Sequence, residues 1–171
     1  MFNLKEYILK KKVNRQKKDL SNKTIVVKPI TKVAILNNPE SQLSFENLKY
    51  VQKALNLHSH QFEIFTFKKK NDHYNELRGI VASKEVFSIF GQIKSPEIKE
   101  FLDKQYDLLL DFTQLSNIYE AYLSLHIKAN LRVGYYNEEQ LYDIMLEVPY
   151  GDIKKFADET ARYLKIIGLL P

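Results

Sequence analysis

The chain has 171 residues, of which 44% are hydrophobic, a length and composition typical of one domain with a core of its own. Because it contains no cysteine, disulfide frameworks, thiolate metal sites, iron–sulfur clusters and cysteine nucleophiles are excluded. The N-terminus lacks the apolar region of a secretory signal, and no window approaches the roughly 18 consecutive apolar residues of a membrane-spanning helix. We therefore expect a cytoplasmic protein without a transmembrane segment.

The net charge of +5 is distributed unevenly along the chain. Residues 1–32 hold ten Lys or Arg against two acidic residues, a local net charge of +8. The rest of the chain carries 16 basic and 19 acidic residues, a net charge of −3. The basicity therefore belongs to the N-terminal segment, and a polyanionic partner is expected to meet that segment first.

The first 20 residues contain no Pro or Gly and consist mostly of good helix formers. This pattern predicts a basic amphipathic helix over 1–20. Residues at three–four spacing would form one face of it: Leu4, Tyr7, Ile8, Lys11 and Arg15.

The segment that follows interrupts the helical pattern. Residues 24–28 are largely β-branched and could form a short strand, which Pro29 would end. We place a linker over 21–32 and an α/β domain over 33–171.

The domain is predicted to begin with a strand, a helix and a second strand. Residues 33–37 form a continuous apolar run, typical of a strand buried on both faces. Ser44 is the expected N-cap of a helix that ends near Leu57, and residues 61–67 alternate as a strand does. These elements indicate a right-handed crossover between parallel strands.

The remainder of the chain continues this alternation. Ser95 followed by Pro96 and Glu97 predicts a helix start. The other expected elements are short strands around 80–81 and 86–90, a buried strand over 106–112, a helix over 118–126, a strand over 131–135, an edge strand within 141–148 and a last helix capped by Asp152. The sequence thus predicts the α/β class, with a single Rossmann-like, mostly parallel sheet carrying helices on both faces, preceded by the basic helix.

Most familiar catalytic motifs are missing. The five glycines are scattered singly, so neither the Rossmann nor the P-loop phosphate cradle is present. No nucleophile elbow, zinc-protease helix or kinase motif occurs either. His58 and His60 could reach one metal ion, but spacing places no third ligand beside them, which favours a solvated loop pair. We expect no cofactor and no metal, and the sequence favours a non-catalytic protein.

Polar residues at the strand ends form one candidate site, because ligands of open α/β sheets bind beyond the carboxyl ends of the strands. Lys94 and Ser95 could hold an anion at a helix N-terminus, although Ser95 could equally be only a cap. Asp111 could orient a ligand hydroxyl or cap the next turn. The candidate ligand residues are Asn37, Gln92, Lys94, Ser95 and Asp111.

The basic helix forms the other candidate site. Its cations could contact the phosphates of a nucleic acid, or lie on anionic headgroups with the apolar side chains inserted in a membrane. Alternatively, they could be solvated while an apolar edge of the helix packs on the domain. The candidate nucleic-acid-binding residues are Lys5, Lys10, Lys11, Lys12, Arg15, Lys17 and Lys18.

Three stretches carry a resemblance to known proteins, at 90–95, 106–111 and 128–134. Together they resemble a small uncharacterised family from Bacteroidota, particularly flavobacteria, which offers no functional residue to carry over. Residues 106–135 are also similar to part of the N-terminal domain of bacterial heptosyltransferases. That likeness implies shared architecture rather than transferase activity, because the second domain of such an enzyme cannot fit in 171 residues.

These observations leave three hypotheses open. The leading one is a non-catalytic binding protein whose basic helix docks on RNA or the ribosome. The second is a binder of small anionic or sugar-nucleotide-like molecules, or a transferase-like enzyme, that uses the strand ends. The third is a protein-interaction module whose helix packs on another protein.

Overall fold

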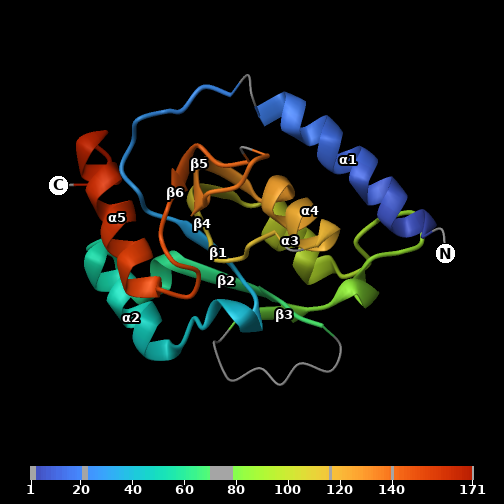
Figure 1. Ribbon diagram of the computed structural model, residues 1–171, viewed down its shortest axis with the longest axis horizontal. Helices are drawn as coiled ribbons and strands as arrows, with labels where there is room; N and C mark the ends of the chain where they lie inside the picture. The colour runs from blue at the N-terminus through green and yellow to red at the C-terminus, as the bar shows by residue number, and fades with distance from the viewer. Residues whose placement is uncertain (1–2, 21–22, 70–78, 116, 140, 171) are drawn as a thin grey trace.

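The protein is built around one parallel sheet (Figure 1). The computed structural model describes residues 3–20, 23–69, 79–115, 117–139 and 141–170. The strand order of the sheet is β3-β2-β1-β4-β5-β6, and each neighbouring pair is parallel. The α/β class and the parallel sheet are therefore confirmed. The strands are β1 (Val33–Asn37), β2 (Phe62–Phe67), β3 (Ile80–Ala82), β4 (Gln105–Asp111), β5 (Lys128–Tyr135) and β6 (Ile144–Leu146).

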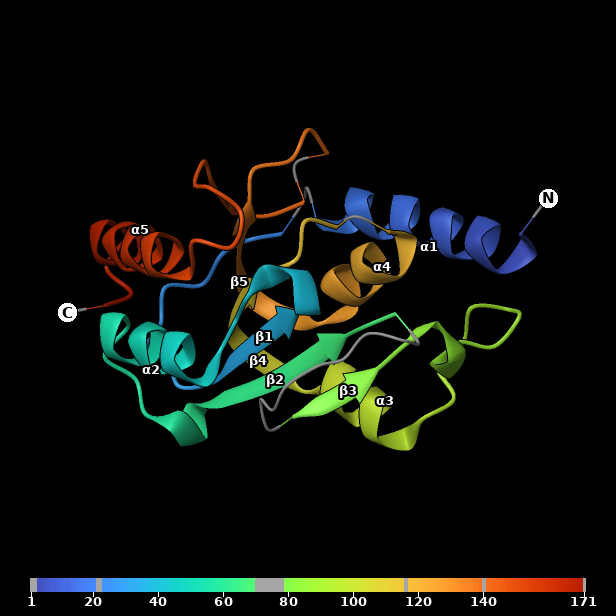
Figure 2. The ribbon, with the colours of Figure 1, turned by 60° about the horizontal axis from the view of Figure 1, so that its bottom comes forward.

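Helices cover both faces of the sheet, as the sequence predicted. On one face lie α2 and α5, on the other α3 and α4, and α1 packs on the outer side of α4 (Figure 2). The helices in the described residues are α1 (Leu4–Leu20), α2 (Phe45–Ala54), α3 (Pro96–Asp103), α4 (Ile118–His126) and α5 (Ile153–Ile166).

The central strand β1 shows why its sequence is apolar without alternation. Ala34 and Leu36 belong to the core under α3 and α4, whereas Val33 and Ile35 belong to the core under α2 and α5. Successive side chains of a strand point to opposite faces, and here both faces are covered. Every residue of β1 is consequently buried.

The prediction of a strand over 86–90 is wrong. Phe87 forms only an isolated antiparallel bridge with Ile93, and the chain between them reverses in a tight turn. The Ser88 side chain accepts hydrogen bonds from the N–H groups of Phe90 and Gln92 within that turn. Backbone bonds from Ser88 N–H to Gln92 O at 2.8 Å and from Lys94 N–H to Val86 O at 2.9 Å close the turn, and this segment pairs with its own return and not with the sheet.

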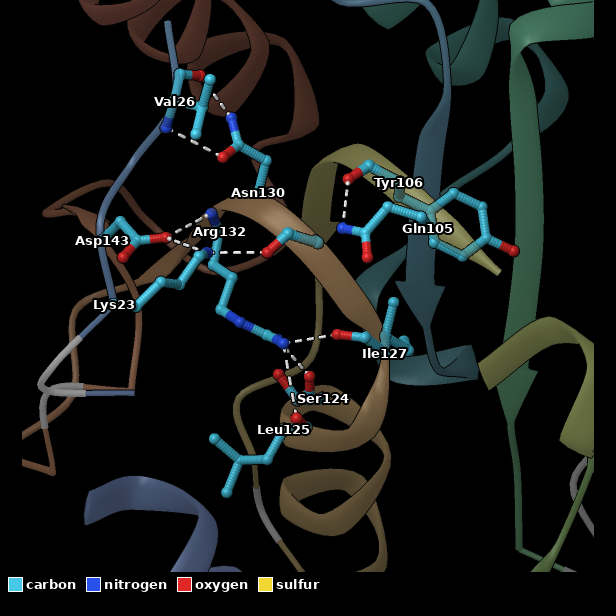
Figure 3. Close-up of polar contacts among 11 residues, drawn as sticks. Lys23, Val26, Gln105, Tyr106, Ser124, Leu125, Ile127, Asn130, Arg132 and Asp143 are labelled. Carbon is cyan, nitrogen blue, oxygen red and sulfur yellow. Dashed lines mark hydrogen bonds and ion pairs between the residues drawn. The ribbon is translucent and has the colours of Figure 1, made fainter. Parts of the chain in front are cut away.

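The prediction of a strand over 24–28 is also wrong. The backbone of this segment forms hydrogen bonds with a side chain and not with a neighbouring strand (Figure 3). Val26 N–H donates to Asn130 Oδ1 at 3.0 Å, and Asn130 Nδ2 donates to Val26 O at 2.6 Å. Lys23 Nζ donates to Ala129 O at 2.7 Å and lies 3.4 Å from an Asp143 oxygen. The segment is thus an extended strap fastened to the start of β5 and to the loop before β6.

Asp107 fastens the far end of the same segment. Its Oδ2 accepts from Thr31 N–H and Thr31 Oγ1, both at 2.8 Å, and from Lys32 N–H at 2.9 Å. Its Oδ1 pairs with Lys28 Nζ at 2.6 Å. Burial alone would raise the pKa of Asp107, but these hydrogen bonds outweigh burial and lower it to about 2.

Asp107 is expected to make stability fall in acid. Its folded pKa lies below the ordinary 3.8, so its contribution is present above that value and is lost as the pH falls toward about 2. A shift of this size corresponds to about 2 kcal/mol of unfolding free energy at neutral pH. Urea unfolding at neutral pH should show a loss of about this size in Asp107→Asn, and the difference from the wild type should shrink in acid. If the two proteins differed in unfolding free energy by the same amount at neutral and at acidic pH, this role of Asp107 would be contradicted.

Candidate functional site

The basic helix α1 packs on the domain through an apolar edge, which was one of the alternatives that the sequence left open. Leu9 and Val13 are buried in the core, whereas Leu4 and Tyr7 remain 47% and 46% exposed. Of the apolar residues that the spacing grouped on one face, Leu4 and Tyr7 therefore do not face the core, whereas Ile8 is half-buried beside the turn at Gly91. Spacing identified an apolar arc at the start of the helix, but the arc through Leu9 and Val13 is the one that meets α4 and the turn at Gly91.

Some of the candidate cations are bonded to the body of the domain. Lys5 Nζ donates to the carbonyl of Lys84 at 3.1 Å, and Lys12 Nζ donates to the carbonyl of Gly91 at 2.8 Å. A lysine that bonds a carbonyl in this way keeps further N–H groups available, because an ammonium has three. These two side chains therefore anchor α1 while keeping their charge.

Other candidate cations lie along the opposite side of α1. Lys11, Arg15 and Lys18 follow one another at spacings of four and three, which places them in one row along the helix, and all three are exposed. Lys11 Nζ lies 4.7 Å from the centre of the Tyr7 ring. We call Lys11, Arg15 and Lys18 the outer row.

A cavity of about 740 Å³ lies between α1 and the loops after β4 and β5. It occupies the carboxyl edge of the sheet, where open α/β sheets bind ligands. Lys10 and Lys17 contribute positive charge to its lining, and Lys17 forms an ion pair with Glu139. Three acids and several amides share the lining, so the charge of this cavity favours no single class of ligand: Glu6, Asn14, Gln114, Asn117, Asn137, Glu138 and Glu139.

Asn37 and its neighbour fill the point where the strand order reverses, between β1 and β4. Asn37 Nδ2 lies 3.4 Å from Thr66 Oγ1. Asn38 donates to Glu120 Oε1 at 3.0 Å and accepts from the Tyr150 hydroxyl at 2.9 Å. Both asparagines, Thr66 and Glu120 are buried and Tyr150 is half-buried, so bonded side chains occupy the crevice in which such folds bind nucleotides.

Asp111 ends the neighbouring strand and is completely buried. It accepts from Thr113 N–H at 2.9 Å, Thr113 Oγ1 at 2.7 Å and the Tyr142 hydroxyl at 2.8 Å. Burial raises the pKa of Asp111 to about 6, although these hydrogen bonds act in the opposite direction. The shift therefore arises in a buried cluster that Asp111 forms with Thr113 and Tyr142.

The remaining strand-end candidates lie on the segment that enters α3. The Ser95 side chain accepts from Ile98 N–H at 3.4 Å and is therefore the N-cap of α3. Lys94 is exposed, and its N–H donates to Val86 O at 2.9 Å. Gln92 lines a second cavity, of about 470 Å³, together with residues of α1, α3 and α4.

Arg132 is a buried cation whose role the sequence did not indicate. Its guanidinium donates to the carbonyls of Ser124 and Ile127, and to that of Leu125 at 3.4 Å (Figure 3). These carbonyls belong to the end of α4, where a helix lacks N–H partners of its own. The one available signal was an arginine inside the apolar run of β5.

The histidines do not assemble a metal site in the described part of the chain. His58 and His60 stack with 5.7 Å between ring centres. Among the described residues, no group of three or more His, Asp or Glu side chains could hold a metal ion. No helix in those same residues is long and apolar enough to cross a membrane.

Comparison with known proteins assigns the chain to a family. Residues 5–167 match a family described as "Family of unknown function (DUF6913)", and the chain belongs to that family. No curated protein and no solved structure matches the chain. The comparisons therefore assign a family, and they do not extend the local likeness to heptosyltransferases.

Proposed function

We propose that this member of a family of unknown function is a non-catalytic protein that binds RNA through the outer face of α1. The observation that carries the proposal is the outer row on a helix that the domain holds in place. A docked helix presents its charges without the entropy cost of ordering a free segment. Residues of the row would contact backbone phosphates, which gives affinity with little sequence preference.

The distribution of charge supports a polyanionic partner. The +8 of residues 1–32 contrasts with the −3 of the remaining chain, so the positive excess lies in the segment that contains α1, and a polyanion is attracted there first. A ribosome-bound state would use the same contacts, since ribosomal RNA presents a dense array of phosphates.

The outer face suits RNA better than a membrane surface. A helix lying on a bilayer inserts an apolar face along its whole length. On the side of α1 that carries the outer row, the exposed apolar side chains are Leu4 and Tyr7, both near the start of the helix. The rest of that side carries the cations of the outer row. Binding to anionic vesicles in place of RNA would contradict the proposal.

Neutralising the outer row is expected to weaken RNA binding and its salt dependence. In Lys11→Gln/Arg15→Gln/Lys18→Gln, the slope of log K against log [salt] should fall by about 0.7 for each RNA phosphate that the protein no longer neutralises, or about 2 in total. Fluorescence anisotropy with a labelled single-stranded RNA, measured over a range of salt concentrations, gives this slope. Glutamine keeps the helix propensity of the replaced residues.

A matched control separates the effect of the outer row from the effect of the protein's net charge. Lys53 on α2 and Lys155 and Lys165 on α5 are exposed on the other side of the sheet. Changing these three to Gln removes the same net charge and should leave the slope unchanged. Equal slopes for the wild type and both variants would refute the proposal. Deletion of residues 1–20 is a poor substitute, because Leu9 and Val13 belong to the core.

A further inference from the structure

The 470 Å³ cavity carries an excess of positive charge on an otherwise acidic domain. Lysines from three elements line it: Lys12 of α1, Lys99 of α3 and Lys128 of β5. Asp103 is the one acid among the described residues that line it. The side chains of Lys128 and Asp103 pair at 2.8 Å but are largely exposed, so this ion pair is weak and an incoming anion can replace the carboxylate.

Two contacts position the Lys12 side chain at this cavity. Its bond to Gly91 O positions the ammonium, and Nζ lies 5.8 Å from the centre of the Tyr122 ring. The ring of Tyr122 in turn stacks on His126 with 3.8 Å between ring centres. Both rings line the cavity, which therefore has an aromatic wall beside the ammonium groups.

His126 is sensitive to the charge inside the cavity. Its Nδ1 lies 2.8 Å from the carbonyl of Tyr122, which can only accept, so Nδ1 carries a proton and Nε2 is the second titrating nitrogen. Burial lowers the pKa of His126, and the charges of Lys12 and Arg132 lower it further, against the hydrogen bond to Tyr122. Lys99 and Asp103 of α3 and Lys128 of β5 also line the cavity beside it.

We propose that this cavity binds a phosphate group through the ammonium groups of Lys12, Lys99 and Lys128. Three lysines from separate elements, with Gln92 as an additional donor, match the charge and the several acceptor oxygens of a phosphate. The group could belong to a phosphorylated small molecule or to the terminal phosphate of a nucleic acid. The site is independent of the outer row, so either proposal can fail without the other.

The test uses the full chain and inorganic phosphate, with His126 followed by NMR. Saturable phosphate binding should raise the pKa of His126 toward its ordinary value, because an anion offsets the neighbouring cations. Chloride at the same ionic strength should not do so. An identical response to both salts would show ionic screening alone and would overturn the proposal.

Two sets of variants locate the site. Lys99→Gln/Lys128→Gln should weaken phosphate binding by about tenfold or more, because two charged hydrogen-bond donors are removed. Lys49→Gln/Lys53→Gln on α2 is the control with equal net charge, and the outer-row variant should also retain phosphate binding. Unchanged affinity in Lys99→Gln/Lys128→Gln would overturn the proposal.

Competition then distinguishes the sources of the phosphate. Displacement by glycerol phosphate but not by RNA would identify a small phosphorylated ligand. Displacement by a 5′-phosphorylated oligonucleotide, and not by the 5′-hydroxyl form, would identify a nucleic-acid end. Displacement by neither would mean that inorganic phosphate binds adventitiously, and it would overturn the proposal.

Discussion

Arg132→Met is expected to lower the free energy of unfolding by about 3 kcal/mol, because buried carbonyl groups lose their hydrogen-bond donor. The guanidinium serves Ser124, Leu125 and Ile127 at the end of α4, and Arg132 is only 3% exposed. Methionine fills much of the same space but donates nothing. For a domain of this size, thermal unfolding should shift down by about 10 °C.

Two further variants test this explanation. Arg132→Lys keeps the charge, but one ammonium cannot reproduce a planar donor that reaches three carbonyls, so its stability should be intermediate. Arg162→Met removes an exposed arginine that pairs with Glu159 on the same helix, and its unfolding should match the wild type. If Arg132→Met unfolded like the wild type, the guanidinium would not be stabilising the end of α4.

Gly134→Ala is expected to be comparably destabilising, by about 3 kcal/mol, because the added methyl group occupies the place of an aromatic ring. A Cβ at position 134 would lie 2.3 Å from Cε2 of Tyr142. The register places Gly134 beside Asp111 of β4, and the Tyr142 hydroxyl donates to that carboxylate. Displacing the ring therefore also removes a hydrogen bond from a buried acid.

A double-mutant cycle with Tyr142→Ala isolates that clash. Without the ring, Gly134→Ala should cost little, so the two changes should be strongly non-additive in chemical unfolding. The destabilisation by Gly134→Ala should also be smaller in mild acid, near the folded pKa of Asp111 at about 6, because a protonated acid tolerates burial better. Additive effects would show that Gly134 is required for another reason.

Both effects concern the part of the sheet that lies under α4 and α1. Arg132 completes the end of α4, and α4 supports α1 with its outer row. Weaker RNA binding in an Arg132 or Gly134 variant would therefore reflect a displaced α1 and not the removal of a residue that touches RNA. Only exposed cations, such as Lys11 and Arg15, test the interface itself.

Local signals in the sequence located most of the elements. The apolar run of 33–37 predicted β1, since a strand covered on both faces needs no alternation. Ser44, Ser95 and Asp152 predicted the starts of α2, α3 and α5, because a cap depends on residues within one helical turn. The charge asymmetry likewise required only counting.

What the sequence could not give are contacts between residues far apart in the chain. Periodicity identifies an apolar arc but not its partner, so it grouped Leu4, Tyr7 and Ile8. Tertiary packing instead buries Leu9 and Val13 against α4 and the turn at Gly91. Asp111 could be named as a polar strand end, but its enclosure by Tyr142 depends on a neighbouring loop. The sequence by itself thus determined the elements and the basic segment, whereas tertiary packing decided which charges face solvent, because burial depends on the arrangement of the whole chain.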